Sequence, residues 1–156
     1  TAVAGPNGFK GYWQMPDKTK AELRDDGFFI TGDLSRIDAD GYVQIVGRGK
    51  DLIISGGYNI YPKEVEIFLD EQDGVLESAV IGAPHPDFGE SVIAVLIPEL
   101  GVTLDLDAIR AAFTRDLAGF KRPRRIEVLD ALPRNTMGKV QKNQLRDQYA
   151  NVFDAV

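Results

Sequence analysis

The chain has 156 residues, of which 44% are hydrophobic and 27% charged, with no cysteine and one histidine. These proportions are those of a globular domain that buries its own core. The formal net charge of -6 argues against a dedicated nucleic-acid binder, because such proteins present a basic face to phosphates. One histidine excludes a multi-histidine metal centre, and no apolar run approaches the roughly 20 residues that span a bilayer. We therefore expect a cytoplasmic protein with no metal site of its own.

The first part of the chain, residues 1–47, is rich in glycine and aromatic side chains and indicates short strands and turns. Alternating apolar runs within 35–46 flank the pair Asp40-Gly41, which is typical of tight hairpin turns. A further extended run at 51–55 ends at two glycines. The chain enters a turn-rich aromatic stretch at once and without an initiator methionine, so we expect a piece of a longer protein.

From residue 62 the apolar period becomes helical. Pro62 suits a first turn, acidic residues follow it, and a helix is expected over 62–72. The remaining elements expected in chain order are strands at 77–82 and 91–97, separated by a loop with two prolines, a helix at 105–117, a strand at 125–129 and a helix at 142–149. This order predicts a compact α/β unit.

Three polar residues are candidates for chemistry on phosphates. Lys139 follows Gly138 in a loop, where glycine lets a ligand approach the backbone and lysine supplies a point charge. Asp33 follows a glycine turn and has the acceptors to bind both hydroxyls of a ribose, and Arg48 offers a planar fork to a phosphate. Taken singly, Asp33 is equally typical of a turn aspartate, whereas Lys139 and Arg48 are more typical of an exposed turn lysine and a strand-end arginine.

Taken in order, five segments resemble the adenylate-forming enzymes, the superfamily of acyl-CoA and aryl-CoA synthetases, peptide-synthetase adenylation domains and firefly luciferase. The resemblance covers nearly the whole chain. It rests on Gly11-Tyr12-Trp13, Thr31-Gly32-Asp33, the run from Gly47 to Asp51, the run from Gly56 to Glu66, and the run from Pro133 to Lys139.

The resemblance implies an α/β (α+β) fold in two parts. Residues 50–156 would form a small C-terminal lid domain, with a three-stranded sheet packed by helices and a two-stranded hairpin. Residues 1–49 would be the last β-rich piece of a large N-terminal adenylation domain, which is the lid's expected partner. The hinge between them would lie near Lys50.

The resemblance also implies roles for single residues. Asp33 matches the aspartate that holds the ribose hydroxyls of ATP, and Arg48 matches an arginine on the same nucleotide. Lys139 matches the lysine that bridges the carboxylate substrate and the α-phosphate. The first half-reaction would form acyl-AMP and pyrophosphate with Mg²⁺. After rotation about Lys50, the thiol of CoA would displace AMP.

Two regions are candidates for binding CoA. Gly56 and Gly57 suit the narrow wall without side chains that a pantetheine arm needs, although a plain turn explains these glycines equally well, and Tyr58 beside them is a further candidate for CoA. Arg122 and Arg124 belong to the densest basic run of the chain, at 121–125, and are candidates for the CoA phosphates. A strand edge protected by charge is the competing interpretation. His85 has no partner in the sequence for catalysis and is expected to be structural.

The phosphate-gripping loop and the acyl pocket of these enzymes are not in the sequence, so the chain alone is expected to be inactive. The amino-acid sequences of residues 27–33 and 133–142 are most similar to those of malonyl-CoA synthetases and their medium-chain and fatty acyl-CoA relatives. An adenylation domain that loads a carrier protein and a non-catalytic module derived from the fold are the other possibilities. The expected ligands are ATP, CoA and a small carboxylic acid.

Overall fold

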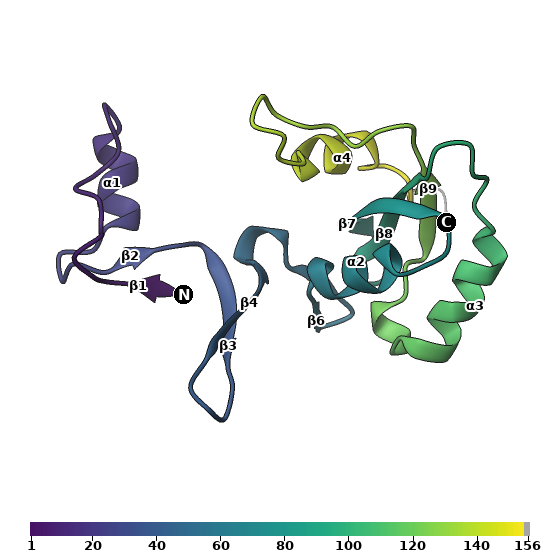
Figure 1. The fold of residues 1–156 in the computed structure, drawn as a ribbon, viewed down its shortest axis with the longest axis horizontal. Coiled ribbons are helices and arrows are strands. Elements are labelled where there is room, and N and C mark those ends of the chain that lie inside the picture. Colours follow the sequence, from purple (N-terminus) through teal and green to yellow (C-terminus); the bar gives the residue numbers. More distant parts are fainter. Residues whose placement is uncertain (155–156) are drawn as a thin grey trace. The chain divides into compact units, whose positions relative to one another are not determined.

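The computed structural model describes residues 1–154 and divides the chain after Lys50 into two compact units (Figure 1). In the first unit, β1 (Ala2–Val3) pairs antiparallel with β2 (Phe29–Ile30), and β3 (Asp33–Ile37) pairs antiparallel with β4 (Val43–Arg48). The β3–β4 pair confirms the hairpin expected around Asp40-Gly41, and Gly41 has a φ of 86°, which suits glycine.

The first unit also contains a helix, α1 (Pro16–Glu22), where sequence reasoning expected only strands and turns. That prediction was wrong. Pro16 at the helix start, Asp17 in the first turn and Lys20 in the last turn are the residues that favour a helix there. None of its residues is buried, so no apolar stripe marked the helix in the sequence.

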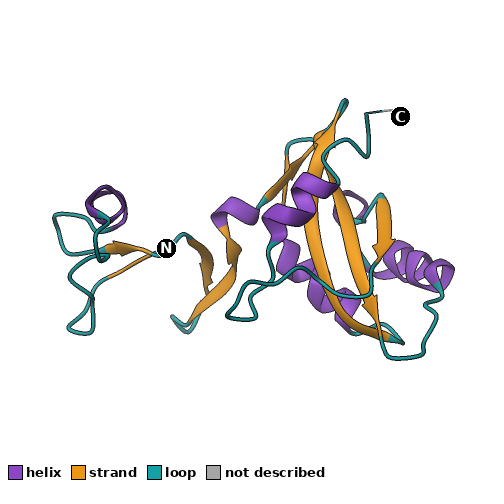
Figure 2. Ribbon diagram, turned by 90° about the horizontal axis from the view of Figure 1, so that it is seen from above, coloured by secondary structure: helices purple, strands orange, loops and turns teal. Residues whose placement is uncertain are grey.

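The second unit is built on a five-stranded sheet in the order β6-β5-β8-β7, with β9 added parallel to β8 (Figure 2). The 3₁₀ helix η1 (Gly49–Asp51) runs across the division between the units. The strands are β5 (Ile53–Ser55), β6 (Tyr58–Ile60), β7 (Val75–His85), β8 (Gly89–Pro98) and β9 (Arg125–Val128). The long strands β7 and β8 with β9 make three strands, and the short β5–β6 hairpin joins them through the single pair Ser55 and Gly89. The expected α/β fold is thus confirmed.

Helices cover both faces of this sheet. Alternate residues of β8 belong to two hydrophobic clusters, one on each face. One cluster joins Val92, Ala94 and Leu96 to α2 (Pro62–Asp70) and α3 (Leu106–Asp116). The other joins Ile93, Val95 and Ile97 to α4 (Lys142–Gln148) and the residues that follow it. Successive strand residues point to opposite faces, so β8 is buried on both sides and forms the centre of the unit.

The two long strands, β7 and β8, are longer than the sequence suggested. Pro84 lies within β7, paired with Glu90, and not in the expected two-proline loop. The strand tolerates this proline because β7 is at the end of the sheet order, where a missing N–H breaks no ladder on its outer side. The β7–β8 connection therefore shrinks to residues 86–88, beside the position where β5 joins β8.

Candidate functional site

Asp33 and Arg48 lie directly opposite each other on β3 and β4. The Nε atom of Arg48 is 3.0 Å from Oδ1 of Asp33, and its Nη1 donates to the carbonyl of Thr31 at 2.8 Å. The backbone N–H of Gly49 donates to Gly32, whose φ of 73° favours glycine. The structure thus brings the two predicted nucleotide residues together, and the glycines allow the backbone to close around them.

This pair borders a pocket of about 720 Å³ in the first unit. Tyr12, Lys18 and Glu22, from the segment around α1, also line it. The hydroxyl of Tyr12 donates to Glu22 at 2.6 Å, and this bond, with burial and the Glu22 charge, raises the pKa of Tyr12. Sequence reasoning singled out Tyr12 only within a motif and did not identify Glu22.

The backbone of the lysine loop, residues 133–141, is fixed by hydrogen bonds within the loop, most of them involving side chains. Asn135 accepts from the N–H groups of Met137 and Lys139 at 3.0 and 2.9 Å. Its own N–H donates to the carbonyl of Lys139 at 2.9 Å, and Arg134 donates to that of Gly138 at 2.7 Å. Gly138 has a φ of 79°, which a side chain would strain. The loop is therefore ordered up to the residue that carries the candidate amine.

The Lys139 side chain itself is exposed. Within residues 1–154 its amine has no ion pair or hydrogen bond, whereas Arg134 at the loop's base is paired with Glu77 of β7. The ordered backbone of the loop thus carries a Lys139 amine that is not paired within these residues, an arrangement that suits binding of an anion from outside the loop. Asn135 and Arg134 organise the loop, and sequence reasoning did not identify either residue in that role.

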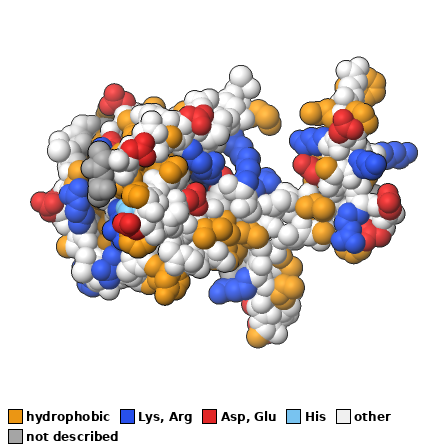
Figure 3. Space-filling model, turned by 180° about the vertical axis from the view of Figure 1, so that it is seen from behind, with side chains coloured by type: hydrophobic (Ala, Val, Ile, Leu, Met, Phe, Trp, Pro, Cys, Tyr) orange, Lys and Arg blue, Asp and Glu red, His pale blue; other side chains and the backbone are white. Residues whose placement is uncertain are grey.

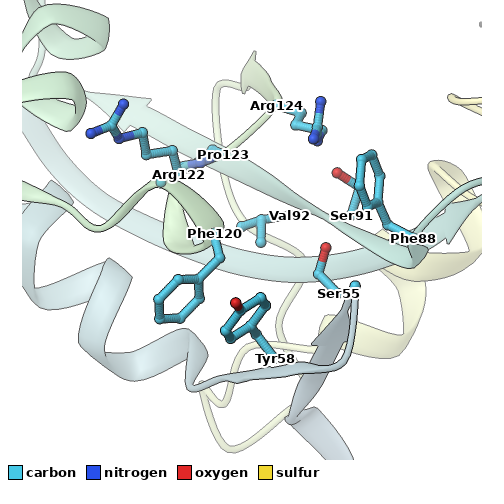
Figure 4. Close-up of a pocket in the computed structure, with 11 residues that line it drawn as sticks. Ser55, Tyr58, Phe88, Ser91, Val92, Phe120, Arg122, Pro123 and Arg124 are labelled. Carbon is cyan, nitrogen blue, oxygen red and sulfur yellow. The ribbon is translucent and has the colours of Figure 1, made fainter.

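The second unit contains a pocket of about 380 Å³ with aromatic walls, which we call the ring pocket (Figure 4). Tyr58 and Phe120 stack with ring centres 4.6 Å apart, and the guanidinium of Arg124 lies 4.3 Å from the centre of the Phe88 ring. Gly56 completes the wall with a φ of 56°, and a Cβ there would contact Phe88 at 3.4 Å.

The structure therefore brings four of the five predicted CoA residues to one pocket. They are Gly56, Tyr58, Arg122 and Arg124. Gly57 has a φ of 83° but is not among the residues lining the pocket. Phe88 and Phe120 were missed, and the signal that points to Phe120 is an aromatic residue directly before the basic run.

The basic residues in the run at 121–125 differ in the groups that they bind. Lys121 lies 2.5 Å from Glu64, and Arg125 is paired with Glu127. Arg122 donates to the carbonyls of Leu117 and Thr114 at the end of α3, and Figure 4 shows its side chain directed away from the stacked rings. Among the described residues, Arg124 is the cation of this run left without a carboxylate or carbonyl partner. It is thus the strongest anion-binding candidate of the four.

Ser91 lies on the floor of the ring pocket and is 1% exposed. Its hydroxyl oxygen is the one buried side-chain polar atom in the described part of the chain that lacks a hydrogen-bond partner. His85 is also buried and packs between Phe88 and Phe153, with its Nδ1 accepting from the Asp87 N–H at 3.2 Å. His85 therefore contacts the back of a pocket wall.

Charges elsewhere are mixed. On the face of the molecule seen in Figure 3, basic and acidic side chains are interspersed. Residues 1–154 contain no group of three or more histidine, aspartate or glutamate side chains arranged to hold a metal ion. No helix in that range is long and apolar enough to cross a membrane.

The structure is an α/β unit preceded by a smaller β-rich unit, and sequence comparison assigns a family to this arrangement. Residues 64–139 match the AMP-binding enzyme C-terminal domain. The chain belongs to the adenylate-forming enzymes and is a C-terminal portion of one. The resemblance expected from the sequence motifs is thus confirmed.

Three relatives illustrate the match. The ATP-bound structure of MatB from Rhodopseudomonas palustris is 58% identical, with a TM-score of 0.88 over 97% of this chain and 30% of that chain. A feruloyl-CoA synthase from Amycolatopsis is 46% identical over 94% of this chain and 30% of the relative. A long-chain-fatty-acid–CoA ligase from Yersinia pestis is 40% identical over 96% of this chain and 26% of the relative. The chain therefore spans less than a third of the length of these proteins.

Proposed function

We propose that the chain is the C-terminal portion of an ATP-dependent carboxylate–CoA ligase and that Lys139 acts in its first half-reaction. In that step a carboxylate oxygen attacks the α-phosphorus of MgATP, the acyl-AMP bond forms, and pyrophosphate leaves. Two anions meet in this transition state, so a cation placed between them lowers the barrier. A unit charge at about 4 Å contributes roughly 4 kcal/mol at an effective dielectric near 20.

The observation that carries this proposal is the lysine loop. Its backbone is ordered by Asn135 and Gly138, while the Lys139 amine is uncommitted within the described residues. Asp33 and Arg48 support the same step as candidates for the ribose and phosphates of the nucleotide, because they already form one polar cluster. The family's ATP-phosphate-binding loop and acyl pocket would come from an N-terminal domain. The chain alone is therefore expected to be inactive.

In the second half-reaction, the thiol of CoA attacks the acyl carbon and AMP leaves, after the second unit has rotated about Lys50. We infer that the ring pocket binds the nucleotide end of CoA. Its aromatic rings offer stacking surfaces to a base, and Arg124, which has no carboxylate or carbonyl partner within residues 1–154, is available for phosphate. This pocket favours CoA over a carrier protein as acceptor, since a carrier-bound pantetheine lacks that nucleotide. A cytoplasmic location accords with the need for ATP and CoA.

Malonate is the substrate we propose. The proposal depends on the similarity of residues 27–33 and 133–142 to malonyl-CoA synthetases and on the 58% identity to MatB, a malonyl-CoA synthetase. Medium-chain and fatty acids are the alternatives, since a long-chain-fatty-acid–CoA ligase is also a relative. A substrate panel on the full-length enzyme, read by pyrophosphate release, would reject malonate if that acid gave no release while another acid did.

Lys139→Ala in the full-length enzyme tests the catalytic assignment. We expect acyl-AMP formation, measured as pyrophosphate release without CoA, to fall by at least about 100-fold, as for loss of a preorganised transition-state contact. Thioester formation from preformed acyl-AMP and CoA should not change. Lys63→Ala removes another exposed lysine, from α2, and should leave both steps intact. An unchanged first step in Lys139→Ala would refute the role.

A further inference from the structure

Helix α4 directly follows the lysine loop and is ion-paired at two positions one helical turn apart. The Nζ atom of Lys142 lies 2.5 Å from Oε1 of Glu66 on α2. The Nη2 atom of Arg146 lies 2.5 Å from Oδ1 of Asp51 in η1. Residues four apart share a helix face, so both contacts hold the same side of α4. We call these two ion pairs the α4 clamp.

The clamp is largely shielded from water. Its carboxylates are 9% exposed in Glu66 and 17% in Asp51, whereas the pair Arg110 and Asp107 on α3 is 56% and 96% exposed. Shielded pairs are screened less by salt and are costly to break, because one charge is left buried alone. Glu66 also accepts from the Val80 N–H at 2.9 Å, so one carboxylate ties α2, β7 and α4 together.

The second contact of the clamp lies at an informative place in the chain. Asp51 is the first residue of the second unit and follows Lys50, the proposed hinge. Arg146 lies shortly after Lys139 in sequence, with only the end of the lysine loop and the first turn of α4 between them. The clamp therefore connects the residue next to the proposed hinge, Lys50, to the helix that directly follows the Lys139 loop.

We propose that the α4 clamp positions the lysine loop relative to the start of the second unit, so that rotation about Lys50 carries the Lys139 amine as part of one rigid body. The proposal rests on the proposed function. A displacement of about 1 Å at a reacting group costs on the order of 100-fold in rate. Lys142, Arg146, Glu66 and Asp51 are positioning residues in this scheme, since they act through Lys139.

The test uses Arg146→Met and Lys142→Met in the full-length enzyme, with the half-reactions measured separately. We expect the kcat for acyl-AMP formation to fall on the order of tenfold in each, with little change in KM for ATP. Thioester formation from preformed acyl-AMP and CoA should keep its rate, because Lys139 is not needed there. Arg146→Lys should recover most of the loss. The control Arg110→Met breaks the exposed pair on α3 and should change neither step.

Hydrogen exchange gives a readout that does not depend on activity. In Arg146→Met the amides of Met137 and Lys139, which donate to Asn135, should exchange faster, while those of β8 should not. Equal losses in both half-reactions, or unchanged exchange in the loop, would overturn the proposal. If Arg146→Met fails to fold, the exchanged pair Asp51→Arg with Arg146→Asp must restore the first step, and failure to do so also overturns it.

Failure of this inference is distinguishable from failure of the proposed function. If Lys139→Ala abolishes acyl-AMP formation while Arg146→Met and Lys142→Met leave it intact, the lysine stays assigned and the clamp does not position it. If the wild-type enzyme forms no acyl-AMP, or if Lys139→Ala is fully active, the proposed function is wrong and the clamp loses its role with it.

Discussion

The lysine loop and the ring pocket belong to the same unit but are built in opposite ways. In the loop the backbone is fixed by hydrogen bonds through Asn135, and the functional side chain is uncommitted within the described residues. In the ring pocket the functional side chains contact one another and form the walls, since Tyr58 stacks on Phe120 and Arg124 lies over Phe88. The difference indicates that the loop provides precision for a transition state and the pocket provides contact area for binding.

The largest effect that would break this contrast is expected from Asn135→Ala. Removing its side chain deletes the acceptor for two backbone N–H groups of the lysine loop. The kcat of acyl-AMP formation should fall roughly tenfold to 100-fold through misplacement of Lys139, measured as pyrophosphate release. Asn143→Ala, an exposed asparagine on α4, is the matched control and should be neutral. A rise in the KM for CoA instead would contradict the division of roles.

An effect of similar size, on CoA binding and not on the rate of acyl-AMP formation, is expected from Arg124→Ala, which removes the ring-pocket cation that has no carboxylate or carbonyl partner among the described residues. A charge-assisted hydrogen bond contributes about 1.5–3 kcal/mol, so the KM for CoA should rise by roughly tenfold to 100-fold, with acyl-AMP formation unchanged. The comparison with pantetheine, which has no nucleotide, sharpens the test. Wild type and variant should use pantetheine equally well, and a difference there would place the contact elsewhere.

The smallest effect is expected from Ser91→Ala. Its buried hydroxyl has no partner among the described residues, so its removal should stabilise the second unit by about 1 kcal/mol. Ser78→Ala is the matched opposite, because the Ser78 hydroxyl donates to Asp70 at 2.7 Å and its loss should destabilise. Native-state hydrogen exchange of β8 amides measures both variants. Loss of stability in Ser91→Ala would mean that its hydroxyl is satisfied in solution.

Sequence reasoning predicted well wherever the signal was periodic or local. The α3 helix, expected over 105–117, is observed as Leu106–Asp116 with Asp105 capping its first N–H groups, and the Asp-Gly hairpin formed as expected. The unburied helix α1 was missed because it has no apolar period. The length of β7 was underestimated because the tolerance of Pro84 depends on its place at the sheet edge, a non-local fact.

The candidate site was predictable in part for the same reason. Motif residues such as Asp33, Arg48 and Lys139 were named from the sequence, and the structure pairs the first two. The residues of the basic run look alike in the sequence. The structure distinguishes them by their contacts, because Arg122 caps α3 whereas Arg124 lies over the Phe88 ring. Ion pairs between distant segments, such as Asp51 with Arg146, leave no local pattern at all. Such contacts depend on the assembled fold.

Strand β8 is the element that bonds to three other strands, β5, β7 and β9. Its residues 92–96 are almost fully buried, with hydrophobic clusters on both faces. Amides in such a strand exchange only through the highest-energy opening of the unit, whereas the lysine loop and ring pocket lie at its periphery. The unit therefore has a built-in internal reference, against which a ligand that orders one periphery can be followed residue by residue without disturbing the other.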